Sequence, residues 1–458
     1  MKCLSTLLGA GAVAAAVVLA PPAASAADAA PSGYVVVLKD AVADPAGVSA
    51  EQVGRYGARR SAVFTHAIRG YAAELTRSQA AAVAADPAVQ FVTEDRTVTL
   101  PPIPARAECG VVDPRAAQCL PHWNDRIDVD RSSARAGDGR GSVHVNVAVI
   151  DSGIAGDHPD LNVRGGVDCG TGTAAVPGTS LTDPVFHGTA VAGMVGAKDN
   201  QIGMVGAAPG TPLWSAKTVD ANGIYTLSSV LCAIDWVTST RQDTSPSNDI
   251  AVANISLAFD GTDDGNCGLT NHDALHLAIC RSVAAGVSYV AAAGNESRDL
   301  ATLIPGAYDE VLTVTAMADF DGKPGGEAAP QCYGADMGPL GFADDAAAPF
   351  SNFAVTPRDY LHTLAAPGVC VETTVPPNLG EYAVVDGTSF AAPAVAGTLA
   401  LCIADGRCRA GSPARNLLTL QADAALYNLS HPAFGYQGDP LRPSLRRYHG
   451  FLIRAASY

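Results

Sequence analysis

The chain has 458 residues, of which 48% are hydrophobic and 16% are charged, and its formal net charge at pH 7 is −16. This length exceeds one compact core of ordinary size and predicts two folded units, while the apolar content excludes a disordered chain. Residues 1–105 carry 8 basic and 8 acidic residues, whereas residues 106–458 carry 21 and 37. This acidic surplus argues against nucleic acid or an anionic membrane as a partner.

The first 26 residues have the three parts of a secretory signal peptide. Lys2 supplies the positive end, Leu4–Ala20 is apolar, and Ala24–Ala26 is a small-residue cleavage site. A membrane anchor would need a longer apolar span with cationic flanks, which this segment lacks. We therefore expect a secreted, extracellular protein that is soluble once residues 1–26 are removed.

Residues 27–100 predict a small α+β domain. Strand-like segments at Tyr34–Lys39 and Val89–Glu94 alternate with helix-compatible segments at about Ser49–Arg59 and Thr76–Ala85. This unit has no cysteine and no set of catalytic residue types, so we expect a structural or regulatory role.

A linker and maturation region is predicted at residues 101–118. Pro101–Glu108 is rich in proline, which favours an extended, exposed linker. Exposed linkers are natural sites of proteolysis, and the chain is therefore expected to be cut here.

Residues 119–430 predict a larger α/β unit, followed by a C-terminal extension at residues 431–458. Buried strands alternate with helices, which indicates a mostly parallel central sheet flanked by helices. Functional residues of such sheets lie in loops beyond the carboxyl ends of the strands. The strands are Val143–Ile150, Asp249–Leu257 and Gly286–Ala293, and the helices are Leu227–Thr240 and Ala274–Ala285.

Ten cysteines remain once Cys3 leaves with the signal peptide, and an even number in an exported chain predicts up to five disulfide bonds. Close spacing favours Cys109–Cys119 and Cys402–Cys408. The pairing of the other six is left open, because fifteen arrangements are possible. No C-x-x-C pair is present, which argues against a zinc site.

Three residues have the types that serine-based acyl transfer requires, namely a hydroxyl, an imidazole and an orienting carboxylate. Asp151 ends an apolar strand, His187 begins a run of small residues, and Ser389 lies between a strand at Tyr382–Val385 and a helix-like run at Phe390–Cys402. Each alone has an ordinary structural interpretation, as a turn residue, a buried polar residue or a helix cap. Their combination favours a catalytic site.

Four motifs strengthen this interpretation: VAVIDSG at 147–153, HGTAVAG at 187–193, AAAGN at 291–295 and GTSFAAPAVAG at 387–397. In this order, from about Cys119 to Tyr427, the sequence resembles the subtilisin-like serine peptidases. The resemblance implies that Ser389 is the nucleophile, His187 the general base and acid, and Asp151 the orienting carboxylate. It also implies an oxyanion hole made of the Asn295 side chain and the Ser389 backbone N–H.

The resemblance further implies an endopeptidase that works through an acyl-enzyme, acts on proteins and peptides, and needs no cofactor for its chemistry. Small or apolar side chains are expected just before the cut, and the protein is expected to be a monomer. Structural calcium is common in the family, but no ligand set is assigned from the sequence. The substrate-binding residues are Ser256, Leu257 and Ala258 on one wall and Ala292, Ala293 and Gly294 on the other.

The N-terminal unit resembles the inhibitory propeptides of these peptidases at Ala67–Leu75 and Phe91–Asp95. This resemblance implies a self-processing zymogen whose propeptide assists folding and then blocks the cleft.

The chain also departs from the family pattern. Ala190 stands where many relatives have a second histidine, and Ala258 replaces a common glycine. The stretch from His187 to Ser389 is longer than in compact relatives, with the excess expected in surface insertions at Asp260–Asn271 and Asp319–Pro349.

Two alternatives stay open at this point. One is an esterase in which Asp423 and His449 serve Ser389, although that fold needs G-x-S-x-G and Ala391 stands at its second glycine. The other is a catalytically silent binding protein built on a peptidase scaffold.

Overall fold

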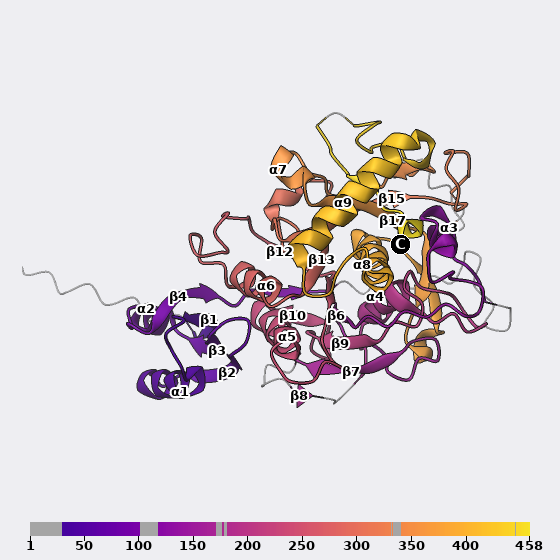
Figure 1. Cartoon of the computed structure of the whole chain (residues 1–458). Coiled ribbons are helices and arrows are strands. Elements are labelled where there is room, and N and C mark those ends of the chain that lie inside the picture. The colour runs from indigo at the N-terminus through magenta and orange to yellow at the C-terminus, as the bar shows by residue number, and fades with distance from the viewer. Residues whose placement is uncertain are drawn as a thin grey trace, which may run out of the picture.

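The computed structural model describes residues 30–100, 118–170, 176–177, 181–330, 332, 340–444 and 446–458. The N-terminal unit is a four-stranded antiparallel sheet of order β2-β3-β1-β4 with two helices. It appears in indigo and purple in Figure 1. Its elements are β1 Ser32–Leu38, α1 Pro45–Tyr56, β2 Arg59–Phe64, β3 Gly70–Leu75, α2 Arg77–Ala84 and β4 Val89–Glu94.

Helix α1 begins and ends earlier than the sequence predicts. The Asp44 side chain accepts a hydrogen bond from the Gly47 N–H and caps the helix, and Pro45 occupies the first turn, where its missing N–H costs nothing. At the other end Gly57 is left-handed with φ +63°, which stops the helix. Arg59, predicted as the last helical residue, instead opens β2.

The larger unit is built on a central sheet that has ten strands within the described residues. Its order is β20-β17-β15-β13-β11-β6-β9-β7-β8, and β16 pairs with β15 off this path. Neighbouring strands are parallel except for the antiparallel pairs β7–β8 and β15–β16. The strands are β6 Val147–Asp151, β7 Val163–Asp168, β8 Val176–Pro177, β9 Leu213–Lys217, β11 Val252–Ile255, β13 Ser288–Ala292, β15 Val311–Ala318, β16 Ala346–Ala347, β17 Thr363–Val369 and β20 Phe451–Leu452.

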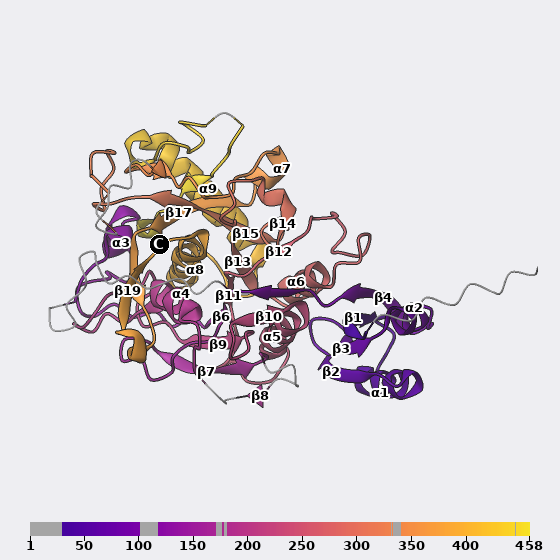
Figure 2. The same ribbon diagram turned by 180° about the vertical axis from the view of Figure 1, so that it is seen from behind.

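Helices cover both faces of this sheet, as expected for buried parallel strands. Alternate residues of β6 show the two faces: Val147 and Val149 join the core that contains α4 and α8, whereas Ala148 and Ile150 join the core of α5 and α6. Figures 1 and 2 show these helices on opposite sides of the strands. The helices of this unit are α3 His122–Arg126, α4 His187–Gly196, α5 Leu227–Thr240, α6 Ala274–Ala284, α7 Pro357–Tyr360, α8 Thr388–Asp405 and α9 Pro413–Ser430.

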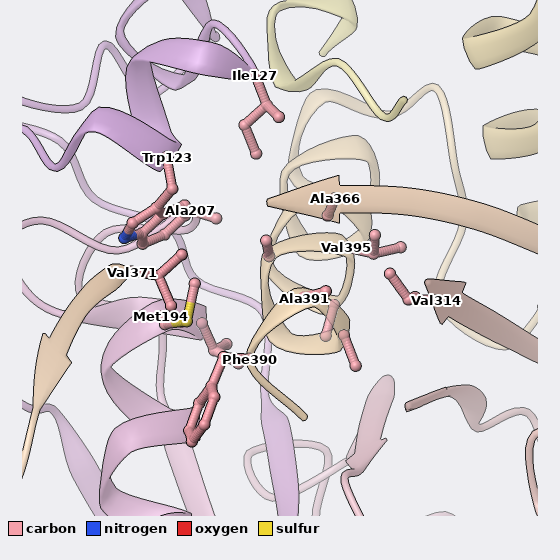
Figure 3. Close-up of a cluster of buried hydrophobic side chains, with 14 of the residues drawn as sticks. Trp123, Ile127, Met194, Ala207, Val314, Ala366, Val371, Phe390, Ala391 and Val395 are labelled. Atoms are coloured by element: carbon pink, nitrogen blue, oxygen red, sulfur yellow. The ribbon is translucent and has the colours of Figure 1, made fainter. Parts of the chain in front are cut away.

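Helix α8 passes through the centre of the unit. Figure 3 shows its residues Ala391 and Val395 among buried side chains that include Val314 of β15 and Ala366 of β17. In the described part of the chain, α8 alone is long and apolar enough to cross a membrane by length and composition, with a mean hydropathy of 1.4. However, 78% of its span is buried inside the protein, as in the core helix of a soluble protein.

Residues 431–458, predicted as an extension, fold back onto the larger unit. Phe451–Leu452 forms β20, the edge strand that pairs with β17. The Asn428 side chain of α9 donates a hydrogen bond of 2.9 Å to the Leu452 carbonyl, and Tyr436 and His449 are buried. The apolar residues of this segment therefore complete the sheet edge and the core beneath α9.

Four disulfide bonds lie within the described residues: Cys169–Cys232, Cys267–Cys280, Cys332–Cys370 and Cys402–Cys408. The predicted Cys402–Cys408 pair is confirmed. Cys109, the other predicted partner of Cys119, lies outside the described residues. Cys119 is exposed and has no disulfide partner among those that are described.

Three two-stranded pairings complete the architecture within the described residues. The strand predicted at Tyr382–Val385 forms as β19, but it pairs antiparallel with β18 instead of joining the central sheet. A second ribbon joins the end of the N-terminal unit to the larger unit through β5 and β10, and β12 pairs with β14. These strands are β5 Thr97–Thr99, β10 Ile224–Thr226, β12 Phe259–Asp260, β14 Leu303–Ile304, β18 Val371–Thr374 and β19 Tyr382–Val385.

Candidate active site

The fold brings the four predicted catalytic positions to the same edge of the sheet. Asp151 is the last residue of β6, His187 is the first residue of α4, Asn295 follows β13, and Ser389 is in the first turn of α8. His187, Asn295 and Ser389 all line a cleft of about 480 Å³. Asp151 is fully buried behind His187. We refer to this cavity as the cleft.

Asp151 and His187 form a hydrogen-bonded pair. Nδ1 of His187 lies 2.8 Å from Oδ1 of Asp151, and the same oxygen accepts a 2.6 Å hydrogen bond from the Ser152 N–H. Burial lowers the pKa of His187, but the charge and the hydrogen bond of Asp151 outweigh burial, and the net pKa is raised. Because Nδ1 is held by the carboxylate, Nε2 is the ring nitrogen left for proton transfer.

Asp183, which was not predicted as a site residue, organises the residues around this pair. It lies in the loop before α4, where its negative charge also raises the pKa of His187. The Ser152 hydroxyl donates to Asp183 and accepts from the Gly188 N–H, and so ties the turn after Asp151 to the start of α4. The Asp-Pro turn at 183–184 was the available signal. The donors to the Asp183 carboxylate are the hydroxyls of Ser152 and Thr189 and the N–H groups of Val185, Phe186 and Thr189.

Ser389 lies at a tight entry into α8. Gly387 precedes the helix with φ +143°, a conformation that L side chains rarely adopt. The Ser389 N–H is in the first turn of the helix, where N–H groups have no acceptor within the helix. These features give position 389 a backbone donor without an acceptor in the helix, beside its hydroxyl.

The Ser389 hydroxyl points to the Ser256 carbonyl at 3.4 Å, and the Ser256 hydroxyl donates to the Ser389 carbonyl at 2.8 Å. Within the described residues, no hydrogen bond joins Ser389 to His187, although both line the cleft. Catalytic hydrogen bonds often shorten only when substrate is bound. A rotation about the Cα–Cβ bond of Ser389 redirects its hydroxyl without moving the backbone.

Asn295 is exposed at the cleft, and its amide is oriented by Thr388. The Asn295 Oδ1 accepts hydrogen bonds of 2.9 Å from both the N–H and the hydroxyl of Thr388. The Thr388 hydroxyl in turn accepts from the Gly294 N–H at 3.0 Å. With the oxygen committed to Thr388, Nδ2 of Asn295 is the free donor, and it lies beside Gly387. This is the geometry that an oxyanion hole needs.

Five of the six predicted substrate-binding residues line the cleft: Ser256, Leu257 and Ala258 on one wall, and Ala292 and Gly294 on the other. Ala293 does not line it. Its side chain is buried, and its N–H, one residue beyond the end of β13, donates to the Val314 carbonyl of β15. Successive side chains of an extended segment point to opposite faces, which accounts for the loss of Ala293 between Ala292 and Gly294.

The end of the N-terminal unit lies in the cleft. β5 pairs antiparallel with β10, and the Leu100 N–H extends the ladder with a 3.0 Å hydrogen bond to the Gly223 carbonyl. Figure 2 shows this indigo segment leaving the N-terminal unit and running into the larger one. Substrate pairing was predicted for Ser256–Ala258 alone. β10 was not predicted, because a run of three residues is too short to show a periodic pattern.

The residues of the esterase alternative do not meet Ser389. Asp423 forms an ion pair with Arg407, and His449 is buried against Phe353. Burial lowers the pKa of His449 to about 4. Neither residue lines the cleft, and none of the cleft residues that the structure describes comes from the C-terminal region beyond Ser389.

Three groups of described residues have metal-ligand types, and none is assigned as a calcium site. In the first, Cys267 and Cys280 are joined in a disulfide. In the second, Asp264 already accepts hydrogen bonds from four backbone N–H groups. In the third, the buried Arg126 forms an ion pair with Asp319. In each group at least one member is therefore already engaged by another protein group.

Comparison with known proteins agrees with this geometry. The model of the subtilase family matches residues 142–436, and the model of the peptidase inhibitor I9 family matches residues 33–101.

Three subtilisins are among the similar proteins. Subtilisin E of Bacillus subtilis (strain 168) is 31% identical over 323 residues, which cover 69% of this chain and 66% of that protein. Subtilisin DY of Bacillus licheniformis is 32% identical over 310 residues, which cover 67% of this chain and 92% of that protein. The subtilisin of Bacillus pumilus is 32% identical over 292 residues, or 63% of this chain and 86% of that protein. The chain therefore belongs to the subtilase family and is a serine endopeptidase made as a zymogen, with an inhibitor domain ahead of its peptidase domain.

Proposed function

We propose that this subtilase is a secreted endopeptidase in which Ser389, His187 and Asp151 form the catalytic triad and Asn295 completes the oxyanion hole. The observation that carries this proposal is the buried Asp151–His187 hydrogen bond, which meets the same cleft as Ser389 and Asn295. The chemistry uses protein groups alone and needs no metal or cofactor.

The reaction follows from the positions of these groups. Ser389 Oγ attacks the carbonyl carbon of the substrate while its proton passes to His187 Nε2. The negative charge that develops on the carbonyl oxygen is stabilised by Asn295 Nδ2 and the Ser389 N–H. The C–N bond then breaks, and His187 returns the proton to the leaving amine nitrogen. Water repeats both steps on the acyl-serine ester, which releases the acid and restores the enzyme.

The buried carboxylate of Asp151 has a defined part in this cycle. It fixes the tautomer of His187 and stabilises the imidazolium that forms when the proton arrives. Asp183 acts through His187 and the start of α4, so we treat it as a positioning residue.

The inhibitor domain supplies the latent state. Its final strand, β5, lies along the wall of the cleft as an extended substrate would, through backbone pairing with little demand on sequence. We propose that residues 27–100 are this inhibitory propeptide, that residues 1–26 are a signal peptide, and that maturation cuts within residues 101–118. Proteins and peptides with small or apolar side chains before the cut are the proposed substrates.

The remaining parts of the proposal concern assembly. We propose that the mature enzyme is an extracellular monomer that binds neither nucleic acid nor membrane, in keeping with its acidic peptidase unit. Calcium that stabilises the fold without taking part in the chemistry stays compatible with this proposal, with no site assigned.

Self-processing tests the proposal. Wild type, Ser389→Ala and the matched control Ser245→Ala, which alters an exposed loop serine, are expressed from the full-length gene and their intact masses measured. Wild type and the control should lose the propeptide by a cut within residues 101–118, and Ser389→Ala should stay uncut. Normal processing of purified Ser389→Ala would contradict the assignment.

A further inference from the structure

Tyr225 joins β10, which pairs with the bound segment β5, to the cleft wall formed by Ser256, Leu257 and Ala258. It is the middle residue of β10, and its hydroxyl donates a 2.8 Å hydrogen bond to the Ala258 carbonyl and accepts one of 3.3 Å from the Ala258 N–H. Ala258 lies across the cleft from β10, in the wall of Ser256, Leu257 and Ala258 that follows the end of β11. The Tyr225 ring packs edge-on against Phe259 at 5.3 Å and is 3% exposed. The side chain therefore fills the floor between the walls.

The hydrogen bonds to Tyr225 engage the N–H and C=O of Ala258, which a substrate would need in order to form a second β-ladder along this wall. An extended peptide that inserts between two walls can pair with both, provided that each wall offers free N–H and C=O groups. Here the single N–H of Ala258 is directed to Tyr225. Consistently, the described residues of β5 pair with β10 alone, in a sheet of two strands.

The side chains of the bound segment also meet Tyr225. Val98 lies directly opposite Tyr225 in the ladder, and directly opposed residues of an antiparallel pair share one face. Thr97 and Thr99 are exposed, whereas Val98 and Leu100 are half-buried against the core that contains Tyr225. The floor of the cleft thus receives every second side chain, and Tyr225 forms the floor beneath Val98.

We infer that Tyr225 determines specificity in this peptidase: it restricts backbone pairing to one wall and selects a substrate side chain no larger than a branched aliphatic one opposite β10. This inference deepens the proposed function and rests on it. The preferred substrate class is an extended segment with valine or a smaller apolar residue at the Val98 register. An aromatic side chain there would compete with the rings of Tyr225 and Phe259 for the same volume.

Three mature enzymes test the inference: wild type, Tyr225→Phe and Tyr225→Ala. The matched control is Tyr360→Phe, which removes a tyrosine hydroxyl bound to the Val355 carbonyl, and Tyr360 does not line the cleft. Quenched-fluorescence peptides vary one position at a time on the amino-terminal side of the cut between alanine, valine, leucine and phenylalanine. Active-site titration and thermal denaturation establish that each variant is folded.

In Tyr225→Ala, the ratio of kcat/KM for phenylalanine over valine should rise at least about tenfold at one peptide position and stay unchanged at the others. In Tyr225→Phe, the freed Ala258 groups should raise kcat/KM about five- to tenfold for peptides that reach β10, the gain expected from one added hydrogen bond. Short peptides that do not reach β10 should be unaffected. The control should match wild type throughout.

Wild-type selectivity in Tyr225→Ala, or no length-dependent gain in Tyr225→Phe, would overturn the inference while leaving the proposed function intact. Failure of the proposed function is separate, because wild type would then turn over no peptide, or Ser389→Ala would retain activity. If Tyr225→Ala does not fold, the Tyr225→Phe length series still decides the pairing claim.

Discussion

Asp235 of α5 anchors the inhibitor domain, and its removal should weaken inhibition strongly. Three consecutive N–H groups in the loop between β2 and β3 converge on its carboxylate: Thr65 at 3.0 Å, His66 at 2.7 Å and Ala67 at 2.7 Å. Asp235 is 8% exposed, so these hydrogen bonds form in a largely dry environment. Such a set of backbone donors is a specific anion receptor.

The expected change in the dissociation constant of the inhibitor domain follows from the hydrogen-bond donors that the substitution leaves unpaired. Truncating one partner of a buried, hydrogen-bonded charged contact costs about 2–5 kcal/mol, or about 30- to 5000-fold in the dissociation constant. Asp235→Ala leaves three donors without an acceptor and should lie toward the upper end of this range. Asp235→Asn keeps one acceptor oxygen and should lie toward the lower end.

The assay uses the processed complex, in which the cut inhibitor domain is still bound. Serial dilution with a peptide substrate gives the dissociation constant from the recovery of activity. Asp405→Asn is the matched control, because it removes the same charge from the exposed end of α8. Asp235 does not line the cleft, so kcat of the freed enzyme should be unchanged. A dissociation constant for Asp235→Ala within threefold of wild type would refute this reasoning.

Three further predictions concern the catalytic chemistry. Asn295→Ala should lower kcat about 100- to 1000-fold with little change in KM, because its amide acts on charge that develops in the transition state. Steady-state kinetics that instead show a raised KM with kcat unchanged would indicate that Asn295 binds substrate and transition state equally. The acidic limb of the pH profile of kcat/KM should report His187, with activity lost as the pH falls through a pKa above the ordinary 6.5. Asp151→Asn should move this limb to lower pH and reduce kcat about 10⁴-fold. An acidic limb that stays in place in Asp151→Asn would contradict the pairing of Asp151 with His187. EDTA should leave the initial rate of the mature enzyme unchanged, whereas an immediate loss that zinc or calcium restores would implicate a metal in the chemistry.

Local sequence signals located the elements that carry the site. The apolar run before Asp151 predicted the strand that forms as β6, because consecutive apolar residues place apolar side chains on both faces of a buried strand. The limits of α5 were predicted correctly, since Thr226 caps its start with hydrogen bonds to Ser229. The costly carboxylate at the end of β6 does have the partner that its burial requires, namely His187.

Features made by distant contacts were not predictable in this way. β10 pairs with β5 from the distant N-terminal unit, and its three residues carry no periodic pattern. Asp183 acts through donors that the fold gathers around it. β20 depends on the return of the C-terminal segment to β17. The pairing of Cys169 with Cys232 joins positions 63 residues apart, which spacing alone could not select.

The rate at which a fluorophosphonate labels the mature enzyme tests the account most directly, because the reagent needs an activated serine. Intact-mass and peptide mapping should place a single adduct on Ser389, and labelling of folded His187→Ala from which the propeptide has been removed should be at least about 1000-fold slower. An adduct on another residue, or equal labelling rates in the two proteins, would contradict a cleft in which His187 activates Ser389.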